Sequence, residues 1–199
     1  VPFDLKKPFS IDDWAGIDDD DPDIVEARKI LGDAVDMNAP SIERAGQVFT
    51  FVMDAIYHSG GTPTDALLDA SPLETYRMLS SGEGKGFCEN RALVYYLFAN
   101  AAGVKTRLVD VAGKFGPLKL TGHYFCESWD DDQMRWFLVD PMSSVTEVRN
   151  PGGRLLGTLD IKKLFDTDMI SGCTALYYDP DMKALERHAI EAYGKGNRG

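Results

Sequence analysis

Cysteine is scarce in this chain, and its scarcity limits what can hold the fold together. Three cysteines occur among 199 residues, namely Cys88, Cys126 and Cys173. Small domains that depend on disulfides carry many more, and an odd number leaves at least one thiol unpaired. With 44% hydrophobic residues, the chain is instead long enough to bury one sizeable core, so we expect a single domain.

The chain also has no long apolar run. No stretch approaches the roughly 18 to 20 apolar residues that cross a bilayer, so we predict a soluble protein with no membrane span. The charged opening at residues 1–8 has no signal-peptide core. A start at Val1, without an initiator Met, is compatible with an exported, processed or trimmed form that has lost its targeting segment, which leaves the compartment open.

Basic residues are outnumbered, with 21 Lys and Arg against 32 Asp and Glu. Proteins that follow a phosphate backbone rely on clustered Lys and Arg, so we predict no nucleic-acid partner. The acidic run in residues 12–23 lacks the ligand spacing, the Gly and the closing Glu of a calcium loop, and we interpret it as a solvated surface. The expected organisation is an acidic N-terminal arm over 1–22 and one domain over 23–199.

Apolar residues recur at helical spacing in several segments, and turn residues bound them. We predict helices over residues 23–35, 40–58, 71–79 and 89–102. The third begins with Ser71-Pro72-Leu73-Glu74, in which Ser71 is the N-cap and Glu74 closes a capping box. Gly103 is the expected left-handed stop of the fourth, which we expect to be the central buried helix.

Segments rich in β-branched and apolar residues follow the fourth helix. They predict strands over residues 104–112, 122–129 and 134–140, the last two joined as a hairpin through 130–133. Beyond them we expect a loop over 141–157, a short helix over 160–165, a strand over 174–178 and a closing helix from 179 to about 193. The predicted fold class is therefore α+β.

Three residues at the ends of these elements can form a catalytic relay. Cys88 begins a helix, where unsatisfied N–H groups and the helix dipole favour a thiolate. His123 opens a strand and Asp140 closes the next one, and a hairpin loop at 130–133 places the two directly opposite each other. Cross-strand Cβ atoms lie about 4.5 to 5.5 Å apart, so the carboxylate can accept the imidazole N–H. Along the chain, these residue types occur in the order nucleophile, base and carboxylate that orients the base.

A zinc site built from His123, Cys126, Cys88 and Cys173 is the main competing hypothesis. Residues three apart on a regular strand point to opposite faces, so His123 and Cys126 do not chelate one ion, and we predict no metal. Cys126 is expected to pack in the core or to pair with Cys173.

The sequence around these residues resembles the transglutaminase-like superfamily, which is related to the papain-like cysteine peptidases. The resemblance rests on Gly84-Lys85-Gly86-Phe87-Cys88, on Gly122-His123-Tyr124-Phe125-Cys126-Glu127-Ser128-Trp129, and on Trp136-Phe137-Leu138-Val139-Asp140-Pro141, within residues 45–141. It implies a nucleophile-bearing helix packed on an antiparallel sheet, here with extra N-terminal helices. It also implies that Cys88 is the nucleophile, His123 the general base and acid and Asp140 the orienting carboxylate, with no cofactor.

The function implied by the resemblance is thiol-dependent acyl transfer at an amide bond of a protein, peptide or other amide substrate. Hydrolysis of the peptidase or amidase type is the leading expectation. The alternatives are a glutamine-crosslinking transglutaminase and a non-catalytic binding or assembly module that keeps the fold. Tyr124 and Phe87 are the candidate substrate-binding residues. Asn90 and Arg91 follow Cys88 where many relatives have small or apolar side chains.

Overall fold

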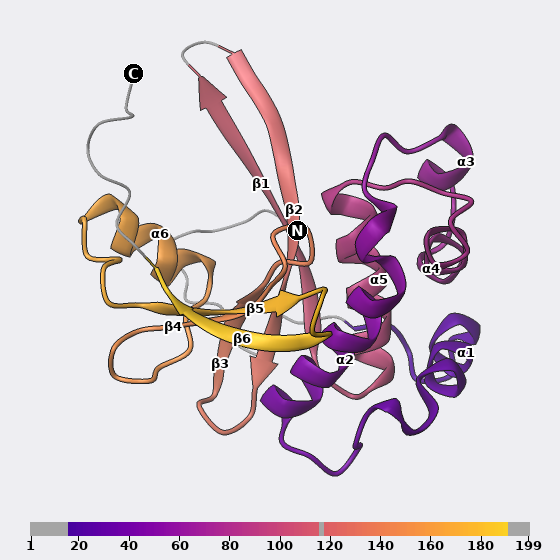
Figure 1. Cartoon of the computed structure of the whole chain (residues 1–199), viewed down its shortest axis with the longest axis horizontal. Coiled ribbons are helices and arrows are strands. Elements are labelled where there is room, and N and C mark those ends of the chain that lie inside the picture. Colours follow the sequence, from indigo (N-terminus) through magenta and orange to yellow (C-terminus); the bar gives the residue numbers. More distant parts are fainter. Residues whose placement is uncertain (1–15, 116–117, 191–199) are drawn as a thin grey trace.

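The computed structural model describes residues 16–115 and 118–190 and has an α+β architecture (Figure 1). The helices are α1 (Pro22–Leu31), α2 (Ser41–Ile56), α3 (Asp65–Leu68), α4 (Pro72–Ser80), α5 (Cys88–Ala101) and α6 (Thr158–Asp166). The strands are β1 (Thr106–Phe115), β2 (Leu118–Asp130), β3 (Arg135–Val139), β4 (Val145–Arg149), β5 (Thr174–Asp179) and β6 (Ala184–Ala189). Most of the expected acidic arm, residues 1–15, lies outside the described residues.

The four predicted helices of the N-terminal half are confirmed, and local caps fix where they begin. Ser71 accepts the backbone N–H of Glu74 at 3.3 Å, and the Glu74 carboxylate accepts the Ser71 N–H at 3.0 Å, which forms the predicted capping box. Asp21 caps α1 by accepting the N–H of Asp23 at 2.8 Å. Because each cap satisfies N–H groups that have no partner inside the helix, the starts of α1 and α4 are set locally.

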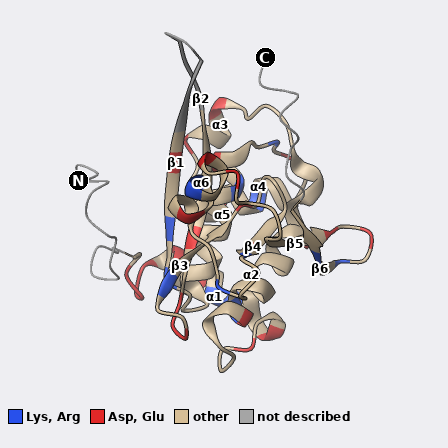
Figure 2. Cartoon of the chain, turned by 90° about the vertical axis from the view of Figure 1, so that its left-hand side faces the viewer, with Lys and Arg blue, Asp and Glu red and all other residues tan. Residues whose placement is uncertain are grey.

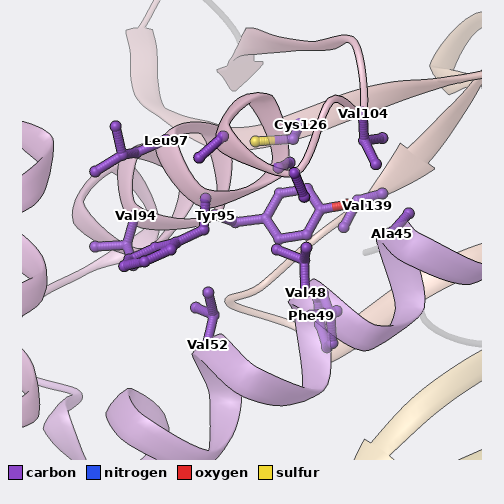
Figure 3. Close-up of a cluster of buried hydrophobic side chains, with 14 of the residues drawn as sticks. Ala45, Val48, Phe49, Val52, Val94, Tyr95, Leu97, Val104, Cys126 and Val139 are labelled. Carbon is purple, nitrogen blue, oxygen red and sulfur yellow. The ribbon is translucent and has the colours of Figure 1, made fainter. Parts of the chain in front are cut away.

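Helix α5 lies at the centre of the core, as the sequence predicts. Most of its side chains are buried, and a helix that is apolar on nearly all sides must be surrounded by other elements. In Figure 3, Tyr95 of α5 lies among Val48 and Phe49 of α2 and Val139 of β3. Its ring is 5.8 Å from that of Phe49 in an edge-to-face arrangement.

The strands form two antiparallel sheets of three, in the orders β1-β2-β3 and β4-β5-β6. Alternate residues of β2 face opposite sides of the first sheet. On one side, Cys126 donates to the carbonyl of Ala92 in α5 at 3.4 Å. On the other side, the Glu127 carboxylate accepts the N–H of Thr158 at the start of α6 at 2.7 Å. The first sheet therefore lies between α5 and α6. In the view of Figure 2, α6 lies in front of β1 and β2.

The register of the β2–β3 hairpin differs from the prediction by two residues. Asp130 pairs with Arg135 and Cys126 with Val139, so the loop is 131–134 instead of 130–133. Met134 has a φ of +49°, which belongs to the turn, and the Asp130 carboxylate accepts the N–H of Gln133 at 3.1 Å. A shift of two residues keeps every side chain on its predicted face, whereas a shift of one would not.

Two expectations for the C-terminal third are wrong. The predicted loop over 141–157 contains strand β4, and the predicted closing helix is a turn followed by strand β6 as far as the structure describes it. The Asp179 carboxylate accepts the N–H groups of Asp181 and Met182, and Lys183 has a φ of +49°, so this segment forms a hairpin turn. Strand β6 then pairs with β5 along its whole length. The predicted strand over 174–178 and the short helix near 160–165 are confirmed.

Among residues 16–115 and 118–190, no helix has the length and apolar character to cross a bilayer.

The contact between α2 and α5 predicts a large stability loss when Phe49 is truncated. Phe49 is fully buried, so Phe49→Ala leaves a cavity and is expected to lower the free energy of unfolding by about 3 to 5 kcal/mol. Met182→Ala, at a side chain 64% exposed, should change it by less than about 0.5 kcal/mol. Urea denaturation of both variants measures the difference. Equal stability of the two variants would contradict this account of the core.

Candidate active site

Cys88 is the first residue of α5, and the segment before it is held on both sides. The Gly86 N–H donates to the carbonyl of Ser59 at 2.9 Å, and the Gly86 carbonyl accepts the N–H of Gly61 at 3.2 Å. A Cβ on Gly86 would lie only 2.8 Å from the Cβ of Asn90. Only glycine allows this approach, so the glycine-rich turn serves to bring the chain tightly into the helix.

Two polar residues after the thiol, Asn90 and Arg91, fix the start of α5. Asn90 is 3% exposed, and its Oδ1 accepts the N–H of Phe87 at 3.1 Å. Arg91 is 5% exposed, and its Nη2 donates to the carbonyl of Tyr57 at 2.6 Å. The sequence identified both only as departures from a family pattern. Their structural role was missed because the Arg91 contact spans 34 positions and leaves no local signal.

The free edge of β2 is the place where Cys88 meets the sheet. Pairing between β2 and β3 ends at Cys126 and Val139, so β3 does not cover the part of β2 that precedes Phe125. There the backbone N–H of Tyr124 and the side chain of His123 lie close enough to the Cys88 thiol to lower its pKa. The thiol and the imidazole are therefore together, as predicted.

His123 and Asp140 are in direct contact, with Nε2 of His123 2.8 Å from Oδ2 of Asp140. The two are diagonal neighbours and not directly opposite, because of the register difference, but a carboxylate and an imidazole are long enough to span that separation. Oδ1 of Asp140 accepts the N–H groups of Met142 at 3.0 Å and Ser143 at 3.2 Å. The Asp140 carboxylate is thus oriented by the turn that follows it. Because Nε2 of His123 contacts Asp140, Nδ1 is the ring nitrogen that remains available to the Cys88 thiol.

The environment shifts the pKa values of the thiol and the imidazole in opposite directions. Partial burial raises the pKa of Cys88, but hydrogen bonds from the Tyr124 N–H and the His123 ring, the charge of His123 and the Glu89 N–H outweigh it, so the pKa is lowered. Burial lowers the pKa of His123, but the hydrogen bond and charge of Asp140, with a smaller contribution from Cys88, raise it overall. Both shifts favour the thiolate–imidazolium pair.

The other two cysteines lie in different environments. Cys126 packs in the main core, which is one of the two expected roles, and Cys173 lies in a second, smaller cluster. Both are free thiols, so the alternative of a pairing between them is wrong. Burial raises the pKa of each. Within the described ranges, no three His, Cys, Asp or Glu side chains are arranged to hold a metal ion.

The two candidate substrate-binding residues lie beside the thiol. Phe87 directly precedes Cys88 and is 46% exposed. The backbone N–H of Tyr124 lies beside the thiol, and its phenol lies near the Asp110 carboxylate. The charge of Asp110, followed by that of Glu89, raises the pKa of the Tyr124 phenol. A groove of about 670 Å³ lies elsewhere, between α2 and the second sheet, and none of the three predicted catalytic residues lines it.

Comparison of the chain with protein-family models, with curated proteins and with solved structures finds no match.

The pKa shifts predict that Cys88 is the most reactive thiol. Its alkylation by iodoacetamide should begin at a lower pH than that of an ordinary thiol, because the thiolate is the reacting form. His123→Ala removes a hydrogen bond to the thiolate and should move this dependence to higher pH. Peptide mass spectrometry separates the three sites, and Cys126 and Cys173 are internal controls that should react slowly. Equal rates at all three cysteines would contradict the geometry.

Replacement of Asp140 should lower the pKa of His123. Asp140→Asn keeps an acceptor for the turn N–H groups but removes the charge that favours imidazolium. The titration of His123, followed by NMR of its ring protons, is expected to move to lower pH. An unchanged His123 titration would show that Asp140 does not control this imidazole.

Proposed function

We propose that the protein catalyses thiol-dependent acyl transfer at an amide bond, with Cys88 as nucleophile, His123 as general base and acid and Asp140 as the orienting carboxylate. The observation that carries the proposal is that the His123 ring lies beside the Cys88 thiol while its Nε2 lies 2.8 Å from the Asp140 carboxylate. Cys88 begins α5 and Asp140 directly follows β3, whereas His123 lies inside β2 and does not open it as the sequence had indicated. The three residues follow the order that activated nucleophiles require. The resemblance of the motifs to the transglutaminase-like superfamily points to the same chemistry.

In the proposed first step, the Cys88 thiolate attacks the amide carbonyl and a tetrahedral oxyanion forms. The N–H groups in the first turn of α5 have no partner inside the helix, so the N–H of Cys88 is a candidate oxyanion donor. The His123 imidazolium then protonates the leaving amine, and a thioester remains on Cys88. His123 next removes a proton from the second reactant, which resolves the thioester. No metal or organic cofactor takes part in these steps.

Hydrolysis is the proposed outcome, with water as the second reactant. His123 supports it because its side chain is 37% exposed, so water can reach the base, while Asp140 behind it is 10% exposed. Transfer to a primary amine would use the same thioester, and the fold alone does not choose between the two acceptors. A non-catalytic module that keeps the fold would instead show no thioester at all.

The test is to incubate the protein with a mixed peptide digest and dansylcadaverine and to follow all products by mass spectrometry. Hydrolysis gives new peptide termini or converted side-chain amides, and amine transfer gives dansyl-labelled peptides. Cys88→Ala should reduce every product at least about a thousandfold, because the covalent intermediate is lost. Cys173→Ala is the matched control and should retain activity. Absence of any Cys88-dependent product would favour the binding module.

A further inference from the structure

Three exposed apolar side chains border the proposed triad, one beside each member. Phe87 is 46% exposed, Val111 is 38% exposed and Met142 is 42% exposed. Phe87 directly precedes Cys88, and Val111 is the direct cross-strand partner of His123. The N–H of Met142 donates to the Asp140 carboxylate at 3.0 Å. We call these three residues the apolar rim.

The proximity of the rim residues follows from the proximity of the triad. Consecutive Cα atoms are about 3.8 Å apart, and cross-strand Cβ atoms are about 5 Å apart, so Phe87 and Val111 each lie within one side-chain length of a triad residue. The triad residues lie together, so the residue before α5, a residue of β1 and one in the turn after β3 are gathered around them. Isolated exposed apolar side chains are ordinary, but apolar side chains gathered at a concentration of reactive groups indicate a binding surface.

Phe125 adds one buried aromatic ring next to the rim. Val111, His123 and Phe125 share one face of the first sheet, because alternate residues of β2 point the same way. Phe125 is 4% exposed, and its ring centroid is 5.7 Å from that of His123. Farther along the same face, Glu127 is covered by the start of α6. The face is thus open at Val111 and His123, and covered farther along at Glu127.

We propose that the apolar rim is the specificity site of this enzyme and that it binds an apolar side chain, alkyl or aryl group next to the scissile amide. This inference rests on the proposed function, because it takes the amide carbonyl to lie at Cys88. A substrate with a charged or small polar group in that position would leave Phe87, Val111 and Met142 exposed and would gain nothing from them.

The rim can be tested without a known substrate by alkylation of Cys88 with two reagents. Iodoacetamide and N-benzyl-iodoacetamide both form a C–S bond with the thiolate and release iodide, but only the second carries an aryl group. The ratio of their rate constants, divided by the same ratio for glutathione, cancels effects of the thiolate fraction. We expect a normalised ratio on the order of ten, the discrimination typical of an apolar pocket.

Rim variants should lower that ratio. Met142→Ser and Val111→Thr are each expected to reduce it several-fold, and Val111→Thr keeps the shape and β-propensity of the strand residue. Met134→Ser and Met182→Ser are matched controls, because their side chains are 67% and 64% exposed and lie in the two hairpin turns. These controls should leave the normalised ratio unchanged.

The outcomes separate this inference from the proposed function. A Cys88 that reacts with neither reagent faster than Cys126 would overturn the proposed function itself. A fast Cys88 whose normalised ratio is near one would leave the thiolate site standing and overturn the apolar rim. A raised ratio that the rim variants do not change would also overturn it, because the aryl group would then be bound by other residues.

Discussion

The contact between the start of α5 and the free edge of β2 is the constraint on which the site depends. Cys88 comes from the helix and His123 from the strand, so their contact requires that one element cannot slide along the other. Two buried bonds prevent sliding: Cys126 donates to the carbonyl of Ala92, and the Tyr95 hydroxyl lies 3.2 Å from the Ser128 hydroxyl. A displacement of one helical turn, about 5.4 Å, would break both bonds and carry the thiol away from the imidazole.

The free edge exists because β3 ends early. A β3 strand that continued past Val139 would cover the edge of β2 where the N–H of Tyr124 reaches the thiol. Pro141 has no N–H to donate to a ladder, and the Asp140 carboxylate draws the following backbone into a turn. The residue that orients the imidazole therefore also ends the strand. In the proposed mechanism, one carboxylate thus both makes room for the nucleophile and positions the base.

Much of this arrangement could be predicted from local patterns. The helical spacing after Cys88 and the stop at Gly103 set the nucleophile at a helix start, and the structure agrees. The predicted contact of His123 with Asp140 is present although the predicted strand register is wrong. A register error of two residues leaves every side chain on its predicted face of the sheet. The burial pattern of the strands therefore constrains the site more strongly than the turn does.

The features that could not be predicted depend on distant partners. Arg91 is buried and donates a hydrogen bond to the carbonyl of Tyr57. No local sequence pattern indicates that a charged residue in the first turn of a helix is buried. The Ala, Leu, Glu and Arg residues of β6 have high helix propensity, so the sequence predicts a helix there. Only the pairing with β5 makes this segment a strand. In both cases tertiary contacts override the local preference.

The difference in exposure between Asp140 and His123 explains how, in the proposed mechanism, the imidazole can act first as an acid and then as a base. The Asp140 side chain is 10% exposed, so little water screens the interaction of its charge with His123. The His123 side chain is 37% exposed, so the side of the ring away from Asp140 stays accessible. In the proposed mechanism, the raised pKa of His123 keeps a proton available for the leaving amine, which water or bulk acid would supply too slowly at neutral pH. The lowered pKa of Cys88 favours transfer of its proton to the imidazole before attack. A lower thiol pKa also reduces intrinsic nucleophilicity, so forming the thiolate and keeping it reactive are opposing demands on this site.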